Sequence, residues 1–239
     1  MDDIFTKDKL QIAIPVLFGA IYFSAFKNGK QTCDRYFLNY FLYLLMSLAL
    51  YYYTMNEVDI NLKGLSIIVF VGLMGCLIGF YMVENIYLKH LLWIILIVCL
   101  GIISKRFYEK FNKDDIKDAL KKLIIILIVC VLMALTFPHL LKPKVEIILI
   151  FALLITILLR LIDHFFYDKK YSKTYSKTYS KTLTYVVVFI FSAFIMYDTK
   201  RVIEFSKQCV DGKTGYLDNV FDMFLNVTVM FENLLKLGE

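Results

Sequence analysis

The chain has 239 residues, of which 59% are hydrophobic and only 20% charged, and its formal net charge is +6. Soluble domains are roughly 45–50% apolar, and their helices carry a charged outer face that long stretches of this chain lack. We therefore exclude a soluble domain and predict an all-α membrane protein that crosses the bilayer several times. The positive charges collect between the apolar stretches, as is usual beside membrane spans, and do not indicate nucleic-acid binding.

Eight apolar stretches approach or reach the roughly 17–25 residues that a bilayer span requires. Backbone groups in lipid must find their hydrogen bonds within the segment, so each stretch is predicted to be a helix. In chain order the predicted helices are 10–26, 36–55, 64–83, 86–104, 123–141, 145–162, 183–198 and 216–237.

The first stretch, 10–26, follows two lysines but precedes no small-residue cleavage site. We interpret it as an uncleaved anchor or first span. It belongs to an N-terminal segment, 1–32, ahead of a predicted seven-helix transmembrane domain, 33–239. With eight spans, the distribution of Lys and Arg favours both ends of the chain in the cytosol. If 10–26 does not cross the membrane, that assignment inverts.

Several local features qualify these elements. Lys89 and His90 lie in the first turns of the fourth helix, from which they can snorkel to the interface. Pro138 is expected to end or kink the fifth helix. The mixed charges of 105–122 predict a solvated segment or a short surface helix. Three copies of YSKT at 171–182 predict a flexible loop, with a lipid-headgroup or phosphorylation patch as the alternative.

The five cysteines show no metal-binding pattern. Cys76, Cys99 and Cys130 lie within apolar stretches and are expected to behave as small hydrophobic residues. Cys33 and Cys209 lie in predicted loops. No CxxC or Cys/His spacing is present, and an odd count of cysteines argues against a disulfide framework.

Asp198 closes the seventh stretch and is followed by Thr199, Lys200 and Arg201. The C-terminus of a helix carries a partial negative charge, which disfavours a carboxylate there. Asp198 therefore needs another partner, such as a base, a cation or a proton.

The last stretch carries Asp218, Asp222 and Asn226 at intervals of four residues, which places them on one stripe of a helix. This helix could lie in the middle of a bundle with its stripe on a cavity. It could equally lie flat at the membrane interface as an amphipathic helix. Periodicity alone does not decide between these arrangements.

Arg160 closes the sixth stretch, three residues before Asp163, with which it can pair locally. The alternative is that Arg160 is a counter-charge that holds a carboxylate inside the bundle. Two carboxylates within a few ångströms cannot both ionise easily, so such a pair responds to pH. It also suits a hard divalent cation. Asp198 facing Asp222 would have this chemistry, with calcium as the candidate metal ion.

The segments MYDTK at 196–200 and YLDNVFDMFLNVTVMFENLL at 216–235 resemble the C-terminal third of the Bax inhibitor-1 family, also called transmembrane BAX inhibitor motif or Lifeguard proteins. HLLWIILIVCLGI at 90–102 and FPHLL at 137–141 are similar to divergent members, including those of large DNA viruses. The resemblance covers 33–237. It implies a bundle of seven helices around a central C-terminal helix.

The resemblance also implies a function, namely a pH-sensitive calcium leak across an intracellular membrane such as the ER or Golgi, and suppression of apoptosis. Its sensor is a pair of aspartates, of which Asp198 matches the first. Asn226 stands where the family has the second. Either the pair is shifted to Asp198 and Asp222, with Asp218 nearby, or it is broken. Calcium is then the permeant ion, and no cofactor is expected.

The expected partners are the lipid bilayer and membrane proteins of the cell-death machinery. The alternative function is a non-conducting membrane protein that acts through partners or lipids. We do not expect an enzyme, because the chain has neither an HExxH nor a Gly-x-Ser-x-Gly motif.

Overall fold

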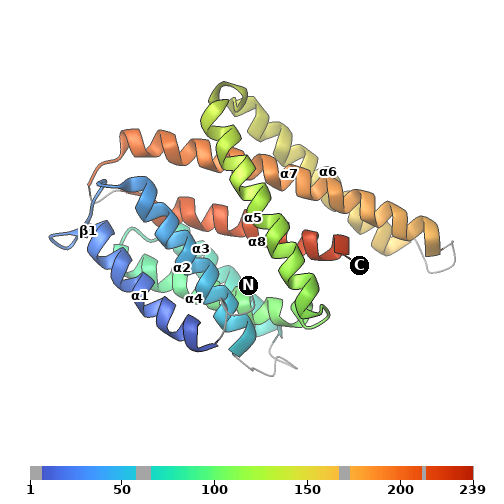
Figure 1. The fold of residues 1–239 in the computed structure, drawn as a ribbon, viewed down its shortest axis with the longest axis horizontal. Coiled ribbons are helices and arrows are strands. Elements are labelled where there is room, and N and C mark those ends of the chain that lie inside the picture. The colour runs from blue at the N-terminus through green and yellow to red at the C-terminus, as the bar shows by residue number, and fades with distance from the viewer. Residues whose placement is uncertain (1–6, 58–65, 167–172, 212–213, 239) are drawn as a thin grey trace. The chain divides into compact units, whose positions relative to one another are not determined.

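The structure is a computed structural model that describes residues 7–57, 66–166, 173–211 and 214–238 (Figure 1). Within these ranges, the description of the side chains leaves out residues 7–8, 66–70, 106, 113, 143, 160–166 and 173–179.

The described residues form eight α-helices, a two-stranded hairpin and a short 3-10 helix. Each α-helix overlaps one of the eight predicted stretches, so the all-helical prediction is confirmed. In chain order the elements are α1 (Lys7–Ala25), β1 (Phe26–Lys27), β2 (Lys30–Gln31), α2 (Tyr36–Glu57), α3 (Ser66–Met82), α4 (Ile86–Tyr108), α5 (Lys113–Thr136), η1 (Pro138–Leu140), α6 (Pro143–Phe166), α7 (Lys173–Gln208) and α8 (Tyr216–Gly238).

Three helices in the described part of the chain are long and apolar enough to cross a membrane, judged by length and composition only. They contain Ile86–Lys105 of α4, Asp114–Thr136 of α5 and Ser180–Gln208 of α7. Lys9–Ala25 and Val71–Met82 are shorter apolar helices. The prediction of an integral membrane protein is therefore supported.

The ends of several helices follow from local sequence. The side chain of Asn85 accepts hydrogen bonds from the first backbone N–H groups of α4, and Asn112 does the same for α5. α5 ends at Thr136, two residues before Pro138, as the sequence predicts. Asn28 and Gly29 adopt positive φ angles of 52° and 74° at the turn between β1 and β2.

α7 is longer than the sequence predicts at both ends. It begins at Lys173, so most of the YSKT repeat is helical, and the prediction of a loop over 171–182 is wrong for residues 173–182. It ends at Gln208, so Asp198 lies about three turns inside the helix and not at its C-terminus. Neither extension contains Gly or Pro, the residues that most often end a helix.

The chain divides into two compact units. The first comprises Met1–Lys110 and Phe205–Phe224, and the second comprises Phe111–Glu204 and Leu225–Glu239. In the first unit α2 packs against α1 and α4, and α4 also packs against α3 (Figure 1).

Aromatic rings fill the interior of the first unit. The ring of Tyr43 on α2 lies 5.6 Å from that of Trp93 on α4 and 5.7 Å from that of Tyr216 on α8. Phe80 on α3 lies 5.2 Å from Phe221 on α8, measured between ring centroids. Offset and edge-on contacts of this kind add to the free energy of burial, so they hold the start of α8 among α2, α3 and α4.

The second unit turns apolar side chains outward. On α5 and α6 many large apolar residues are exposed, whereas soluble proteins rarely expose such contiguous surfaces. This pattern is the one expected of helices in contact with lipid tails. The exposed residues include Ile124, Ile125, Ile128, Val129 and Leu132 on α5, and Ile147, Ile148, Phe151, Leu154, Ile155 and Leu158 on α6.

Candidate ion-sensing site on the last helix

α8 is buried along almost its whole length. From Tyr216 to Leu235 none of its side chains is exposed, and Phe224 and Met230 are fully buried. A helix lying flat at a membrane interface keeps its polar face in water. Burial of both its apolar and its polar residues favours the arrangement inside a bundle over the amphipathic helix at the interface.

Asp198 and Asn226 meet in the second unit. The Asn226 side-chain amide donates a hydrogen bond of 2.6 Å to a carboxylate oxygen of Asp198, which is only 8% exposed. The bond joins the middle of α7 to α8. A hydrogen bond from a neutral donor to a buried carboxylate is charge-assisted and stronger than one between neutral groups. One partner of Asp198 is thus an amide, which is not among the base, cation or proton that the sequence suggests.

Asp218 is paired with Lys89 in the first unit. The Lys89 ammonium lies 2.6 Å and 2.8 Å from the two carboxylate oxygens of Asp218, and 5.2 Å from the centre of the Phe80 ring. The Lys89 side chain is only 16% exposed. The prediction that Lys89 snorkels to the interface is therefore wrong, because an acid on α8 holds it inside the unit.

His90, the neighbour of Lys89, is also held inside the first unit. Its Nε2 lies 2.8 Å from the Tyr43 hydroxyl, and its Nδ1 lies 2.7 Å from the carbonyl oxygen of Ile86. The prediction that His90 snorkels is wrong too, because the Tyr43 hydroxyl on α2 holds its ring inside the unit. Both ring nitrogens have protein partners.

Asp222 lies between the other two stripe residues on α8 and belongs to the first unit. The hydroxyl of Tyr81, near the end of α3, donates a hydrogen bond of 2.9 Å to its carboxylate. Each of the three predicted stripe residues therefore has a partner on a different helix. The pairs are Lys89 with Asp218, Tyr81 with Asp222, and Asp198 with Asn226.

The remaining predicted features of the site are a counter-charge and a metal ion. The side chain of Arg160, the predicted counter-charge, lies outside the described residues. In the described part of the chain, no three His, Cys, Asp or Glu residues gather in a group that could hold a metal ion. A calcium ion at Asp198 and Asp222 stays a prediction.

A family model described as inhibitor of apoptosis-promoting Bax1 matches residues 14–237. The chain belongs to the Bax inhibitor-1 family. The matched region of this Bax inhibitor-1 protein begins inside α1, upstream of residue 33, where the resemblance in the sequence begins. No curated protein and no solved structure matches the chain.

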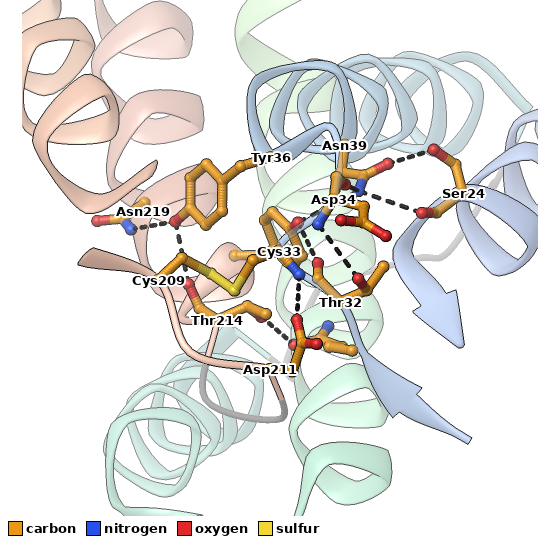
Figure 2. Close-up of a disulfide and its surroundings, with 12 residues drawn as sticks. Ser24, Thr32, Cys33, Asp34, Tyr36, Asn39, Cys209, Asp211, Thr214 and Asn219 are labelled. Carbon is orange, nitrogen blue, oxygen red and sulfur yellow. Dashed lines mark hydrogen bonds between the residues drawn. A yellow bond between two sulfur atoms is a disulfide. The ribbon is translucent and has the colours of Figure 1, made fainter. Parts of the chain in front are cut away.

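A covalent link joins two predicted loops of this Bax inhibitor-1 protein. Cys33 and Cys209 form a disulfide, with their Cα atoms 5.8 Å apart, so the expectation of no disulfide is wrong (Figure 2). The odd count of cysteines does not exclude a disulfide, because Cys76, Cys99 and Cys130 are free thiols. A usable signal was present, since only Cys33 and Cys209 lie outside the apolar stretches.

Proposed function

We propose that this Bax inhibitor-1 protein is a pH-sensitive calcium leak channel that suppresses apoptosis from an intracellular membrane, the ER or the Golgi. In this proposal α2 to α8 form the seven-helix transmembrane bundle around α8, and α1 is an additional helix. Family membership and the apolar helices support the membrane setting. Calcium is the permeant ion, the bilayer is the first partner, and membrane proteins of the cell-death machinery are the others.

The observation that carries the proposal is the hydrogen bond between Asn226 and Asp198. It joins α7 to the buried α8 through a carboxylate that is almost inaccessible to water. An ionised carboxylate is the stronger acceptor, so the contact is most stable when Asp198 is charged. Protonation of Asp198 removes that charge and weakens the link. We therefore assign the bonded pair to the closed state and protonation to opening.

The amide at position 226 sets the sign of the pH response. Asn226 donates its hydrogen at any pH, so the link in this chain fails only on the acidic side. Two carboxylates at the same positions would share one proton, and they would repel each other once both are ionised. An Asn226→Asp variant should therefore lose its link on the alkaline side. The calcium leak should rise with acidification in the natural chain and with alkalinisation in the variant.

The test is calcium flux through the purified full chain in liposomes loaded with a calcium indicator, with the pH stepped from acidic to alkaline. We expect the natural chain to leak more at acidic pH, by at most about tenfold per pH unit for a single titrating group. Asp198→Asn should remove the pH dependence. Asp118→Asn, which changes an exposed acid paired with Lys122 on α5, is the matched control and should behave as the natural chain.

Equal fluxes in the natural chain and Asp198→Asn at every pH would contradict the gate. If Asn226→Asp keeps the pH dependence of the natural chain, the titrating pair lies elsewhere, with Asp222 as the next acid on the stripe. The single variant Asp222→Asn separates these two cases, because it should change the pH response only if the pair is shifted.

The second candidate function is a non-conducting membrane protein that acts through partners or lipids. The specific observation in its favour is again Asn226, because its amide cannot itself titrate and so cannot share a proton with Asp198. If the natural chain is silent at every pH while Asn226→Asp leaks, the chain keeps the family fold without the leak. Its role in cell death should then be sought in the membrane proteins that co-purify with it. Neither function requires an enzyme activity.

A further inference from the structure

The Cys33–Cys209 disulfide lies where two distant segments of the first unit meet (Figure 2). Cys33 follows the β1–β2 hairpin, and Cys209 follows the last residue of α7. Both cysteines are half-buried, and the residues beside them, including Asp34, Val210 and Asp211, are exposed. The disulfide therefore lies close to the surface of the first unit.

Hydrogen bonds join the same two segments around the disulfide. The backbone N–H of Cys33 donates to the Asp211 carboxylate at 2.6 Å, and the Tyr36 hydroxyl donates to the Thr214 carbonyl at 3.0 Å. The hydroxyl of Thr214 donates to the side-chain oxygen of Gln31. Three hydrogen bonds thus join the same two segments that the disulfide joins.

The contacts continue into the start of α8. Gly215 adopts a positive φ of 63° immediately before the helix, a conformation that favours glycine. The Tyr216 hydroxyl donates to the Thr32 carbonyl at 2.7 Å and accepts from the Asn39 amide at 3.2 Å. The first residue of α8 is therefore fixed to the segment that contains Cys33.

We propose that Cys33–Cys209 is a thiol–disulfide exchange site that controls the order of the connection into α8. Its substrate class is a dithiol, such as the paired thiols of a protein oxidoreductase in an oxidising compartment. In the oxidised form the disulfide holds residues 209–211 and 214–216 against the hairpin. In the reduced form only the hydrogen bonds remain, and the connection opens more often.

The exchange balances with one dithiol for each disulfide. A thiolate of the dithiol attacks one of the two sulfur atoms, the Cys33–Cys209 bond breaks, and a mixed disulfide forms. The released cysteine thiolate takes a proton. The second thiol of the dithiol then attacks the mixed disulfide, releases the other cysteine and loses its own proton. The dithiol ends as a disulfide, and the protein ends with two more thiols.

The free cysteines provide the means to isolate this site. Cys76 and Cys99 are half-buried and Cys130 is buried, and all three are free thiols. Changing these three to Ser leaves Cys33 and Cys209 as the only cysteines of the full chain. In this background every thiol that appears on reduction comes from the disulfide.

The experiment equilibrates the purified full-length triple variant with mixtures of reduced and oxidised dithiothreitol. Thiols are counted by the mass that maleimide adds, and hydrogen–deuterium exchange is measured over 26–36 and 209–217. We expect no thiols in the oxidised protein, two in the reduced protein, and amide exchange about tenfold faster in both segments after reduction. Addition of Cys33→Ser and Cys209→Ser should give the fast exchange in every mixture.

Two results would overturn the proposal. The first is two reactive thiols in the protein under oxidising mixtures, which would mean that the disulfide does not form. The second is unchanged amide exchange on reduction, which would make the disulfide a static crosslink. The natural chain serves as the control that the three Ser substitutions do not alter exchange. Neither readout uses ion flux, so failure of the calcium-leak proposal leaves this one standing.

Discussion

Lys89 and Asp218 form a partly buried ion pair in the first unit, and we predict that it stabilises the protein. Their side chains are 16% and 34% exposed. Because neither charge is fully hydrated, Lys89→Met should lower the free energy of unfolding by about 1.5–3 kcal/mol. Asp218→Asn should cost a similar amount, since it leaves the ammonium without its counter-charge. The measurement is denaturant unfolding of the full chain in detergent.

A double-mutant cycle separates the free energy of the Lys89–Asp218 interaction from the other effects of the two substitutions. We expect a coupling free energy of about 1 kcal/mol or more between Lys89 and Asp218. The matched control is the exposed pair Lys122–Asp118 on α5, with side chains 49% and 60% exposed. Pairs of that kind contribute about 0.3–0.5 kcal/mol. Equal coupling in the two cycles would mean that burial adds nothing to the Lys89–Asp218 pair.

At the residue scale, the sequence predicts which polar side chains share one face of the last helix better than it predicts their partners. The four-residue spacing is sufficient to place Asp218, Asp222 and Asn226 on one stripe, because it is a property of the helix itself. The lysine that pairs with Asp218 is 129 residues away in the chain. No local pattern connects the two, so a snorkelling lysine was the natural but wrong interpretation.

Gly101 allows α2 and α4 to approach closely, and we predict that Gly101→Ala destabilises the protein. A Cβ atom there would lie 2.9 Å from the backbone oxygen of Tyr51 and 3.0 Å from the side chain of Thr54. Backbone atoms cannot move aside without shifting α2. We expect a loss of about 1–3 kcal/mol in the free energy of unfolding, as is usual for overpacking.

Gly75→Ala on α3 is the matched control for this prediction. A Cβ atom at Gly75 meets nothing within 4 Å. Alanine is the better helix former by about 0.8–1 kcal/mol in water, so this variant should be as stable as the natural chain or more so. Thermal unfolding of both variants in the same detergent provides the comparison. Equal melting temperatures for the two variants would show that the helices do not rely on this close approach.

At the element scale, the eight apolar stretches correspond to the eight helices because hydropathy and helix length are local properties. The residues at which the helices end depend on more than hydropathy and length. Pro138 marks the end of α5 in the sequence, whereas nothing marks Gln208 as the end of α7. The polar residues after Asp198 resemble a loop by composition, yet they continue the helix because none of them breaks it.

The Cys33–Cys209 disulfide restricts the path of the whole chain through the membrane. Two cysteines can join only on one side of a bilayer, so the chain between them crosses an even number of times. The six helices α2 to α7 lie between them. Disulfides persist in oxidising compartments, such as the ER lumen or the cell exterior. The hairpin and the connection into α8 should therefore face away from the cytosol.

In the described part of the chain after Cys209, α8 is the one helix, so a spanning α8 places its C-terminal end in the cytosol. This prediction does not depend on α1, whose contribution the distribution of Lys and Arg leaves open. It can be tested with Gly238→Cys, at an exposed position at the end of α8. The background should lack Cys76, Cys99 and Cys130. In sealed microsomes this cysteine should react with a membrane-impermeant maleimide without detergent.

Lys27→Cys in the hairpin is the matched control for the opposite side of the membrane, because the side chain of Lys27 is 71% exposed. It should react only after detergent opens the microsomes. Labelling of both cysteines in sealed vesicles would place the hairpin in the cytosol, where glutathione and thioredoxin would keep Cys33 and Cys209 reduced. Protection of Gly238→Cys together with Lys27→Cys would mean that α8 does not cross. Asp198 and Asn226 would then meet outside the hydrocarbon. Their hydrogen bond could not gate a calcium leak, and its pH response would belong to a protein that does not conduct.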